Sequence, residues 1–429
     1  MILDRKTQPA LNTVGDIYIP PIQHARLDNG LPISYINIGS QELVKFQVAI
    51  PAGIVYQNQS LTAFFTNKML KEGSQNYSAA VIAQKMDYYG AFFETRITRD
   101  FAYFNLFCLN KYLAQVLPLV ADMLIAPLFS DSEYSVLREQ EKQNFQLRMQ
   151  KGKNKALKAF NTALFGADHP YGSAATIESY DALQVLDLKS FHQKYYSATS
   201  WRIYLSGKVS EDILAIINQF FGALEMVGES TQKPIIELHE PLSMERMWVE
   251  QKGAMQTAIK MGCLTLDKKH EDYAALSLAQ TIFGGFFGSR LMQNIREDKG
   301  YTYGIHSGIQ HLHQASIFNI SSEVGKDVAS KAHAEILIEL KRLRTELVGE
   351  EEISLVKNYM TGGLLRSLNG PFALGEMMRN LEEFELPENY YSQLTKQVQQ
   401  VSADEILHVA EKYLHEDKML TVMSGSELV

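Results

Sequence analysis

Apolar residues in the first half of the chain recur at every second position and then at helical spacing. Val44, Phe46 and Val48 alternate with polar residues, which predicts a strand with one buried face. The Asn29–Gly30 pair stands before a run of β-forming residues at 33–38 and predicts a tight hairpin turn. Further segments predict strands at 91–97, 102–108 and 202–205, and helices at 61–70, 78–88, 113–127, 188–195 and from 130 past Arg148.

The second half repeats this order of elements. A strand is predicted at 258–263, a helix from Tyr273, and two further strands at 303–309 and 316–321. Glu350 is expected to open a helix, as Asp131 does in the first half. Another helix, from Ala332, is expected to bury one face made of Ile336, Leu340, Leu343 and Leu347.

The end of the chain gives the offset of this repeat. Tyr413 corresponds to Tyr195, and Ser424 corresponds to Ser206, with the same offset in the sequence (413 − 195 and 424 − 206 are both 218). A repeat of half the chain predicts two copies of one α+β domain. The stretch 228–246 has two prolines, few apolar residues and no period, so it is the expected linker between domains at 1–227 and 247–429.

The segment 281–304 carries the densest set of candidate binding residues. A helix capped by Ser289 is predicted within it. The segment does not fit a phosphate-binding loop, because Phe283 stands where the dinucleotide fingerprint needs a glycine and no Lys-Ser or Lys-Thr pair follows. It opens with a cluster of three glycines, Gly284, Gly285 and Gly288.

Arg296 lies at the end of this predicted helix, and Tyr303 follows it across Gly300, which marks a helix stop. An arginine offers five N–H donors and a tyrosine one hydroxyl, so the pair suits holding peptide carbonyls rather than breaking bonds. From the local sequence alone, a surface arginine and a strand tyrosine without a shared function are the simpler interpretation.

Composition and charge exclude several classes of function. Of 429 residues, 46% are hydrophobic and 21% charged, which is typical of a soluble globular protein. The net charge of −8 argues against a nucleic-acid partner. The most apolar run, 116–129, is interrupted by Asp122 and is too short to span a membrane.

A cytoplasmic protein is expected. The N-terminus has no apolar core of a signal peptide. Cys108 and Cys263 match no paired ligand spacing and fit buried thiols, although a single disulfide stays open. His311 and His313 have a spacing compatible with a metal, but no third ligand is evident nearby, so they are expected to be exposed histidines.

Four motifs resemble the pitrilysin-type (inverzincin) zinc peptidases, which include the mitochondrial processing peptidase subunits. They are LDNGL at 27–31, HPYG at 169–172, FHQKYY at 191–196 and, above all, 284–304. Their order and spacing agree over nearly the full length. The resemblance implies two homologous domains, each a mixed, mainly antiparallel sheet packed with helices. It also implies a clamshell of two chains that takes unfolded peptides, and structural roles for His169 and His192.

Active members of that family carry a His-x-x-Glu-His motif on an early helix. This spacing puts two imidazoles on one zinc and lets the glutamate activate water. Aligned on Gly73 and Ser74, the two histidine positions are Phe64 and Lys68 here, and the general base is Asn67. None of these three residues can bind zinc or activate water, because phenylalanine has no lone pair, a lysine repels the metal and an amide takes no proton from water.

The family's distal glutamate ligand falls near Leu147 or Arg148 in this chain, and neither can bind zinc. The zinc site is therefore expected to be lost, with no metal and no cofactor in this chain and no catalytic residue of its own. The resemblance implies that Arg296 and Tyr303 reach substrate beside the zinc of a partner. It also likens the Gly284–Gly288 loop to the glycine-rich loop with which non-catalytic subunits receive substrate.

The function expected from this resemblance is that of a non-catalytic, substrate-binding subunit of a heterodimeric zinc endopeptidase. Its partners are then a sister chain with an intact His-x-x-Glu-His motif and an unfolded peptide, and activity needs that sister. The alternative is a structural or peptide-binding protein of the same fold with no peptidase partner, as in the family's respiratory-complex core subunits. Whether the chain forms a homodimer when alone stays open.

Overall fold

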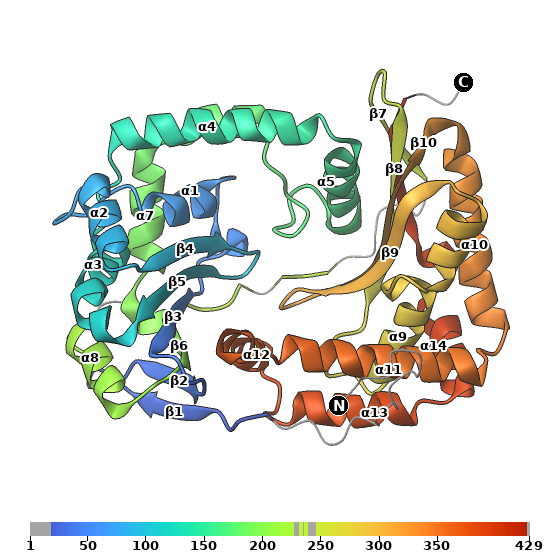
Figure 1. The fold of residues 1–429 in the computed structure, drawn as a ribbon. Coiled ribbons are helices and arrows are strands. Elements are labelled where there is room, and N and C mark those ends of the chain that lie inside the picture. The colour runs from blue at the N-terminus through green and yellow to red at the C-terminus, as the bar shows by residue number, and fades with distance from the viewer. Residues whose placement is uncertain (1–18, 227–230, 235, 239–245, 427–429) are drawn as a thin grey trace, which may run out of the picture.

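The computed structural model describes residues 19–226, 231–234, 236–238 and 246–426. It contains two β-sheets with helices packed on them (Figure 1). Strands between residues 23 and 207 form one sheet, and strands between residues 247 and 425 form the other. The predicted α+β fold of two homologous halves is confirmed.

The N-terminal sheet has six strands in the order β1-β2-β6-β3-β5-β4. Neighbouring strands are antiparallel except β2 and β6, which are parallel. The predicted turn joins β1 to β2, and Gly30 there has a φ of +88°, which glycine adopts without a steric penalty. The strands are β1 (Gln23–Arg26), β2 (Pro32–Asn37), β3 (Leu43–Ile50), β4 (Phe92–Ile97), β5 (Ala102–Leu109) and β6 (Arg202–Gly207).

The C-terminal sheet has five strands in the order β7-β11-β8-β10-β9, and only β7 and β11 are parallel. This order repeats the N-terminal one without a counterpart of β1. Strands β4 and β9 consequently lie at equivalent edges of the two sheets. The strands are β7 (Met247–Glu250), β8 (Gln256–Thr265), β9 (Thr302–His311), β10 (Ser316–Gly325) and β11 (Leu420–Gly425).

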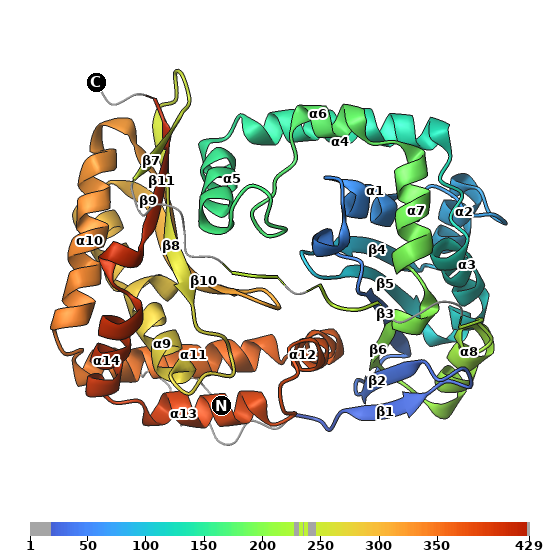
Figure 2. The same ribbon diagram turned by 180° about the vertical axis from the view of Figure 1, so that it is seen from behind.

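The helices also repeat, so that α4 and α5 correspond in position to α11 and α12 (Figure 2). The N-terminal half contains α1 (Thr62–Met69), α2 (Ala79–Tyr88), α3 (Leu113–Ile125), α4 (Asp131–Met149), α5 (Gly152–Phe165), α6 (Ile177–Ala182), α7 (Val185–Tyr195) and α8 (Glu211–Phe221). The C-terminal half contains α9 (Tyr273–Gln280), α10 (Ala329–Thr345), α11 (Glu350–Ser367), α12 (Pro371–Glu383), α13 (Tyr390–Gln400) and α14 (Ala403–Tyr413). Within the described residues, none of the helices is long and apolar enough to cross a lipid bilayer.

One face of the N-terminal sheet is covered by a helix of the other half. Helix α12 packs on β2 and β6, where Met378 and Leu374 lie in one buried cluster with Tyr204. Gly375 is needed at this contact, because an added Cβ would lie 2.4 Å from the Ser206 Oγ. The opposite face packs against α3 and α8 in a separate core.

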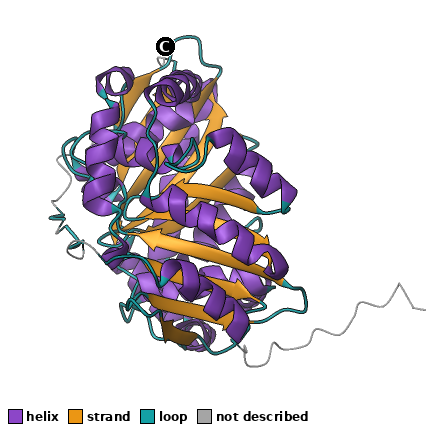
Figure 3. Ribbon diagram, turned by 90° about the vertical axis from the view of Figure 1, so that its left-hand side faces the viewer, coloured by secondary structure: helices purple, strands orange, loops and turns teal. Residues whose placement is uncertain are grey.

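The C-terminal sheet is covered in the reciprocal way. Helix α5, which belongs to the N-terminal half, packs on β8 and β11 of the C-terminal sheet (Figure 1). Its Phe160 is buried together with Leu420 and Val422. The opposite face of this sheet packs on α9, α10 and α14, so helices lie on both sides of the strands (Figure 3). The two corresponding helices, α5 and α12, are thus exchanged between the halves.

An ionic network fixes α12 on the N-terminal sheet. The Tyr103 hydroxyl of β5 donates to the Glu383 Oε1 at 2.8 Å, and Arg379 donates to the other oxygen of Glu383 at 2.8 Å. Lys45 of β3 forms an ion pair with Glu376, which Arg379 also binds at 2.5 Å. Burial opposes ionisation of Glu376, but these two cations hold its pKa at about 2, so Glu376 is charged at neutral pH.

Two details differ from the sequence expectations. Ile336, Leu340 and Leu343 are buried on α10 as predicted, but Leu347 is 59% exposed because the helix ends at Thr345. The predicted linker 228–246 falls largely on residues outside the described ones. Its described part runs past the β9–β10 hairpin, where the Gln314 side chain accepts from the backbone N–H of residue 236 at 3.0 Å. The division into domains at 1–227 and 247–429 stays a prediction.

The exchange predicts that the two halves unfold together. Met378→Ala removes a fully buried side chain between α12 and the N-terminal sheet, so we expect the free energy of unfolding to fall by about 2–5 kcal/mol. Urea denaturation followed by circular dichroism measures this change. Leu355→Ala on α11, where the side chain is 58% exposed, is the control and should stay within about 0.5 kcal/mol of the native chain. Equal effects of the two substitutions would contradict the exchanged packing.

Candidate functional site

The three positions aligned with the zinc motif lie on α1. Asn67 is buried, whereas Phe64 and Lys68 are half-buried. Residues four apart share one face of a helix, and the Lys68 ammonium accordingly lies 5.2 Å from the centre of the Phe64 ring. The two positions that align with the family's histidines therefore face the same space.

The Lys68 ammonium is bound by a carboxylate of α4. Its Nζ lies 2.6 Å from the Glu141 Oε1, and the Glu141 side chain is only 7% exposed. Arg148 adds a second cation, with Nη1 at 4.0 Å from the other Glu141 oxygen. The placement of the family's distal ligand position near Leu147 or Arg148 stays a prediction. Leu147 is 60% exposed, and Glu141 is the residue that the helix presents to Lys68.

Asn67 stands in a buried polar contact. Its Nδ2 donates to the Tyr196 hydroxyl at 3.4 Å and to the Tyr103 carbonyl at 3.5 Å. The Tyr196 ring stacks on His192, whose Nε2 lies 2.8 Å from the Leu124 carbonyl oxygen. Burial lowers the pKa of His192 to about 4, which keeps it neutral and suits a structural role.

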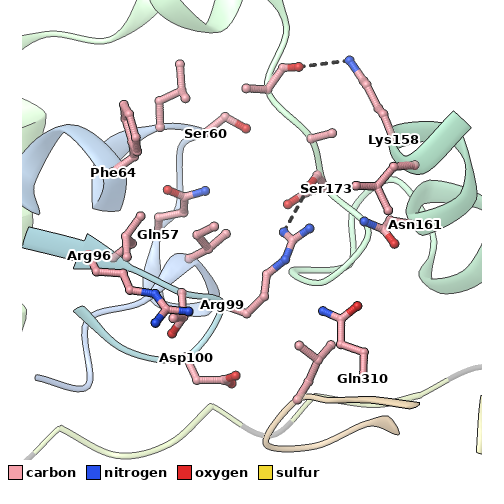
Figure 4. A pocket seen from close by; sticks show the side chains of 18 of the residues that line it. Gln57, Ser60, Phe64, Arg96, Arg99, Asp100, Lys158, Asn161, Ser173 and Gln310 are labelled. Atoms are coloured by element: carbon pink, nitrogen blue, oxygen red, sulfur yellow. Dashed lines mark hydrogen bonds between the residues drawn. The ribbon is translucent and has the colours of Figure 1, made fainter. Parts of the chain in front are cut away.

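A cavity of about 750 Å³ opens beside Phe64, between the two halves. Figure 4 shows Gln57 and Phe64 on one side of it and Lys158 of α5 on the other, with Gln310 of β9 below. Residues of α12 complete the wall. The cavity is therefore built from both halves and includes both exchanged helices.

The HPYG motif supports two charged side chains of this cavity. Arg99 donates to the Pro170 carbonyl at 3.2 Å, and the Tyr171 hydroxyl donates to the Asp100 Oδ1 at 2.7 Å. The His169 Nδ1 accepts from the backbone N–H of Tyr171 at 3.0 Å. Burial raises the pKa of Asp100 above its ordinary value. The motif holds a turn and positions the lining of the cavity.

His311 and His313 are not the exposed histidines that the sequence suggested. The His311 ring lies between the Tyr273 hydroxyl at 3.1 Å and the Ser316 Oγ at 2.8 Å. The His313 ring stacks on Phe384 with ring centres 4.7 Å apart. Burial lowers the pKa of both imidazoles to about 4. Both are packed into the wall between the two halves.

Arg296 and Tyr303 lie on the C-terminal half, outside the large cavity. The Arg296 guanidinium lies 4.4 Å from the centre of the Phe287 ring and 3.3 Å from a Glu297 oxygen. Gly300 ends the preceding helix with a φ of +65°, as predicted. Tyr303 is 92% exposed at the start of β9. The structure holds Arg296 through Phe287 and Glu297 rather than through Tyr303.

Close packing explains why glycine stands at positions 284 and 285. An added Cβ on Gly284 would lie 2.7 Å from the Ser307 Oγ, and one on Gly285 would lie 2.8 Å from the Gln280 Nε2. Both glycines belong to a π-helical turn, Thr281–Gly285, rather than to an open loop. Gly288 is exposed, and the substrate-binding role of these glycines stays a prediction.

The predicted cap of the following helix is absent. The Ser289 hydroxyl is buried and finds no hydrogen-bond partner among the described residues. The helix then continues as a π-helical segment, Met292–Asp298. Its apolar face is as predicted, since Leu291, Met292 and Ile295 are all buried.

Two family models match the chain in succession. Residues 33–169 match "Insulinase (Peptidase family M16)", and residues 182–360 match "Peptidase M16 inactive domain". The chain belongs to peptidase family M16. The resemblance to pitrilysin-type zinc peptidases is thereby confirmed.

Relatives with the M16 fold come from several bacteria. An uncharacterized zinc protease of Mycobacterium tuberculosis is 25% identical over 362 residues, which cover 82% of this chain and 81% of that protein. The uncharacterized zinc protease YmxG of Bacillus subtilis is 21% identical over 411 residues, covering 94% and 98%. A crystal structure of a peptidase M16 inactive domain from Pseudomonas fluorescens matches with a TM-score of 0.85 and 25% identity over 95% of this chain and 99% of that chain. A protease from Helicobacter pylori has a TM-score of 0.86 at 16% identity, over 95% and 100%, and shows the fold alone.

The donor set on α1 of this M16 protein does not fit a zinc ion. Phe64 offers no lone pair, and Lys68 is a cation already bound to Glu141. Among the described residues, no group of three His, Cys, Asp or Glu side chains could hold a metal ion. Lys68 on α1 and Glu141 on α4 instead form an ammonium–carboxylate pair.

Removing this ammonium should destabilise the protein. Lys68→Met leaves the Glu141 carboxylate buried without its partner, which costs roughly 3–5 kcal/mol in a fully buried pair. The Lys68 side chain is 34% exposed, so we expect a loss of about 2 kcal/mol in the free energy of unfolding. Urea denaturation measures it, and adding Glu141→Leu should recover most of the loss.

The matched control for this test is Lys142→Met on the same helix as Glu141. Lys142 pairs with Asp181, which is 55% exposed, and its removal should cost less than about 1 kcal/mol. A loss in Lys68→Met no larger than this would contradict the stabilising role of the α1–α4 pair.

Restoring the donors should create a metal site. The combined substitutions Phe64→His, Asn67→Glu and Lys68→His place two imidazoles beside Glu141, and we expect them to retain about one zinc per chain after dialysis. Mass spectrometry of the metal content measures this, and the same variant with Glu141→Gln should bind zinc more weakly. Stoichiometric zinc in the native chain would show that the pair on α1 and α4 does not replace a metal.

Proposed function

We propose that this M16 protein is the non-catalytic, substrate-binding subunit of a heterodimeric zinc endopeptidase that acts on unfolded peptides. The observation that carries the proposal is the ion pair of Lys68 with Glu141, 2.6 Å apart, at the position of the family's metal site. Asn67 stands at the general-base position and its amide cannot activate water. Zinc and hydrolysis then belong to a sister chain with a complete His-x-x-Glu-His motif.

The large cavity supports a role in peptide binding. Strand β4 lies at the edge of its sheet and, in the part of the chain that the structure describes, pairs only with β5. One row of its backbone N–H and C=O groups therefore remains open to another strand. Arg96 on β4 is exposed and lines the cavity. An extended peptide can add to such an edge through main-chain hydrogen bonds.

Arg296 and Tyr303 suit contact with a substrate held by the sister chain. Both lie outside the large cavity, and Tyr303 is 92% exposed. The Phe287 ring and Glu297 hold the Arg296 guanidinium in one place. A prepositioned cation and a free phenol hydroxyl can bind carbonyl oxygens of a peptide at little cost in side-chain entropy.

We also propose a cytoplasmic location. Cys108 and Cys263, the two cysteines of the chain, are both buried free thiols. Unpaired thiols are the usual state in a reducing compartment.

A second candidate function is a structural or peptide-binding role without a peptidase partner. It is favoured by the same ion pair, because Lys68 and Glu141 satisfy each other and need neither metal nor sister chain. Size-exclusion chromatography of this chain mixed with a motif-bearing M16 chain separates the two candidates. A stable heterodimer supports the first, and its absence supports the second.

The helper role predicts a kinetic effect of the exposed pair. In the mixture with the sister chain, we expect Arg296→Ala to lower kcat/KM for an unstructured peptide by roughly tenfold to a hundredfold, since a hydrogen bond to a charged group contributes about 1.5–3 kcal/mol. Tyr303→Phe should cause a smaller loss. Peptide hydrolysis of the reconstituted pair measures both changes.

Arg26→Ala is the control, because Arg26 is exposed on β1 in the other half and binds only a neighbouring carbonyl. It should leave hydrolysis unchanged. Unchanged turnover in Arg296→Ala would contradict the helper role, and so would an activity of the mixture that does not exceed that of the sister alone.

A further inference from the structure

A second cavity, of about 440 Å³, lies between α5 and the C-terminal sheet. Lys153 and Ala156 of α5 form one wall, and β8, β9 and β10 form the other. Tyr303 lines it, whereas no residue of α1 does. This cavity is therefore distinct from the one beside Phe64 and adjoins the exposed tyrosine.

A row of polar side chains crosses the sheet inside this cavity. Ser321 of β10 stands opposite Lys260 of β8 on one side and opposite His306 of β9 on the other. Residues directly opposite in a sheet share one face. The Lys260 Nζ donates to the Ser321 Oγ at 2.8 Å and to the Asn319 Oδ1 at 2.6 Å. Two neutral oxygens thus fix the ammonium in place.

The contacts of the Lys260 ammonium are with uncharged groups, which include the Phe160 ring at 5.7 Å from its centre. Among the described residues, no carboxylate forms an ion pair with it, and two of its three N–H donors are used by neutral groups. An acidic residue of the lining, Glu323, lies 3.9 Å from the Lys153 ammonium. Burial lowers the pKa of Lys260 to about 8, and burial together with Lys260 lowers the pKa of His306. The cavity is a positive, partly desolvated site.

Space for a ligand exists along β9. An added Cβ on Gly304 or Gly308 would meet no atom within 4 Å. Gly304 and Gly308 lie two residues before and two residues after His306 on β9, so all three are on the same face of the strand. Because a glycine has no side chain, this face of β9 is left uncovered. A chain lying over these glycines can approach Lys260 and Tyr303 together.

We infer that this cavity binds a carboxylate of the peptide substrate, with Lys260 as its fixed cation and Lys153 as a second one. The inference rests on the proposed peptide-binding function and specifies its substrate class. A carboxylate supplies the missing charge and accepts the remaining N–H of Lys260 in a charge-assisted hydrogen bond. It can come from the C-terminus of the peptide or from an acidic side chain.

Fluorescence anisotropy with three labelled, unstructured peptides tests the inference on the full chain. One peptide has no acidic residue and ends in a free carboxylate, the second is its C-terminal amide, and the third is the amide with one internal glutamate. We expect the second peptide, which has no carboxylate, to bind about tenfold more weakly than at least one of the two peptides that carry a carboxylate. Whichever peptide binds more tightly identifies the source of the carboxylate.

Three substitutions complete the test. Lys260→Met should abolish the discrimination, while Lys341→Met, on the exposed side of α10, should preserve it. Because Lys260 is partly buried, its replacement also removes packing contacts. A second pair of substitutions, at Gly304, tests the site without that effect. Gly304→Glu places a competing carboxylate at the open position and should weaken binding of the carboxylate peptides, whereas Gly304→Gln, of the same size, should not.

Three results overturn the inference. Equal binding of all three peptides, or discrimination that survives both Lys260→Met and Gly304→Glu, removes the carboxylate site but leaves peptide binding and the helper role in place. If no peptide binds at all, the carboxylate site and the substrate-binding role both fail. Failure of hydrolysis in the mixture with the sister chain, with discrimination intact, removes only the helper role.

Discussion

Burial of both faces of each sheet is the constraint on which this structure depends. A sheet of five or six strands cannot leave an apolar face in water, and each half of this chain covers only one face of its own sheet. The other face is closed by α5 or α12, supplied by the opposite half. The Arg379–Glu383–Tyr103 network and the close approach of Gly375 to Ser206 adapt α12 to this foreign surface. Neither half is therefore complete by itself.

The exchange also determines where cavities form. The larger one lies where the two halves meet, and both exchanged helices contribute to its wall. The smaller one lies beside α5, where that helix leaves part of the C-terminal sheet uncovered. In each case a sheet edge is nearby, β4 for the first and β9 for the second. The same packing that stabilises the fold thus creates concave surfaces beside backbone groups that can bind an extended chain.

Much of the fold follows from the sequence, since alternation and helical spacing located most strands, the turn at Gly30 and most helices. The exchange of α5 and α12 could not be found in this way, because periodicity marks an apolar face but not the sheet that covers it. The partner of Lys68 was missed for a related reason. Glu141 is one of many polar residues on α4, and only the crossing of α4 over α1 selects it. The packing of His313 could not be found from the sequence, because Phe101 and Phe384, whose rings contact it, are far away in the sequence.

The contact of the α1 lysine with Glu141 does not depend on a metal supply. A zinc ion is bound reversibly, so its occupancy depends on its concentration, on competing ions and on the protonation of its ligands. The Lys68 ammonium is part of the polypeptide and is present once in every folded molecule. It cannot be chelated, exchanged for another divalent cation or lost during zinc starvation. The contact between α1 and α4 is thus made by two side chains of the polypeptide itself.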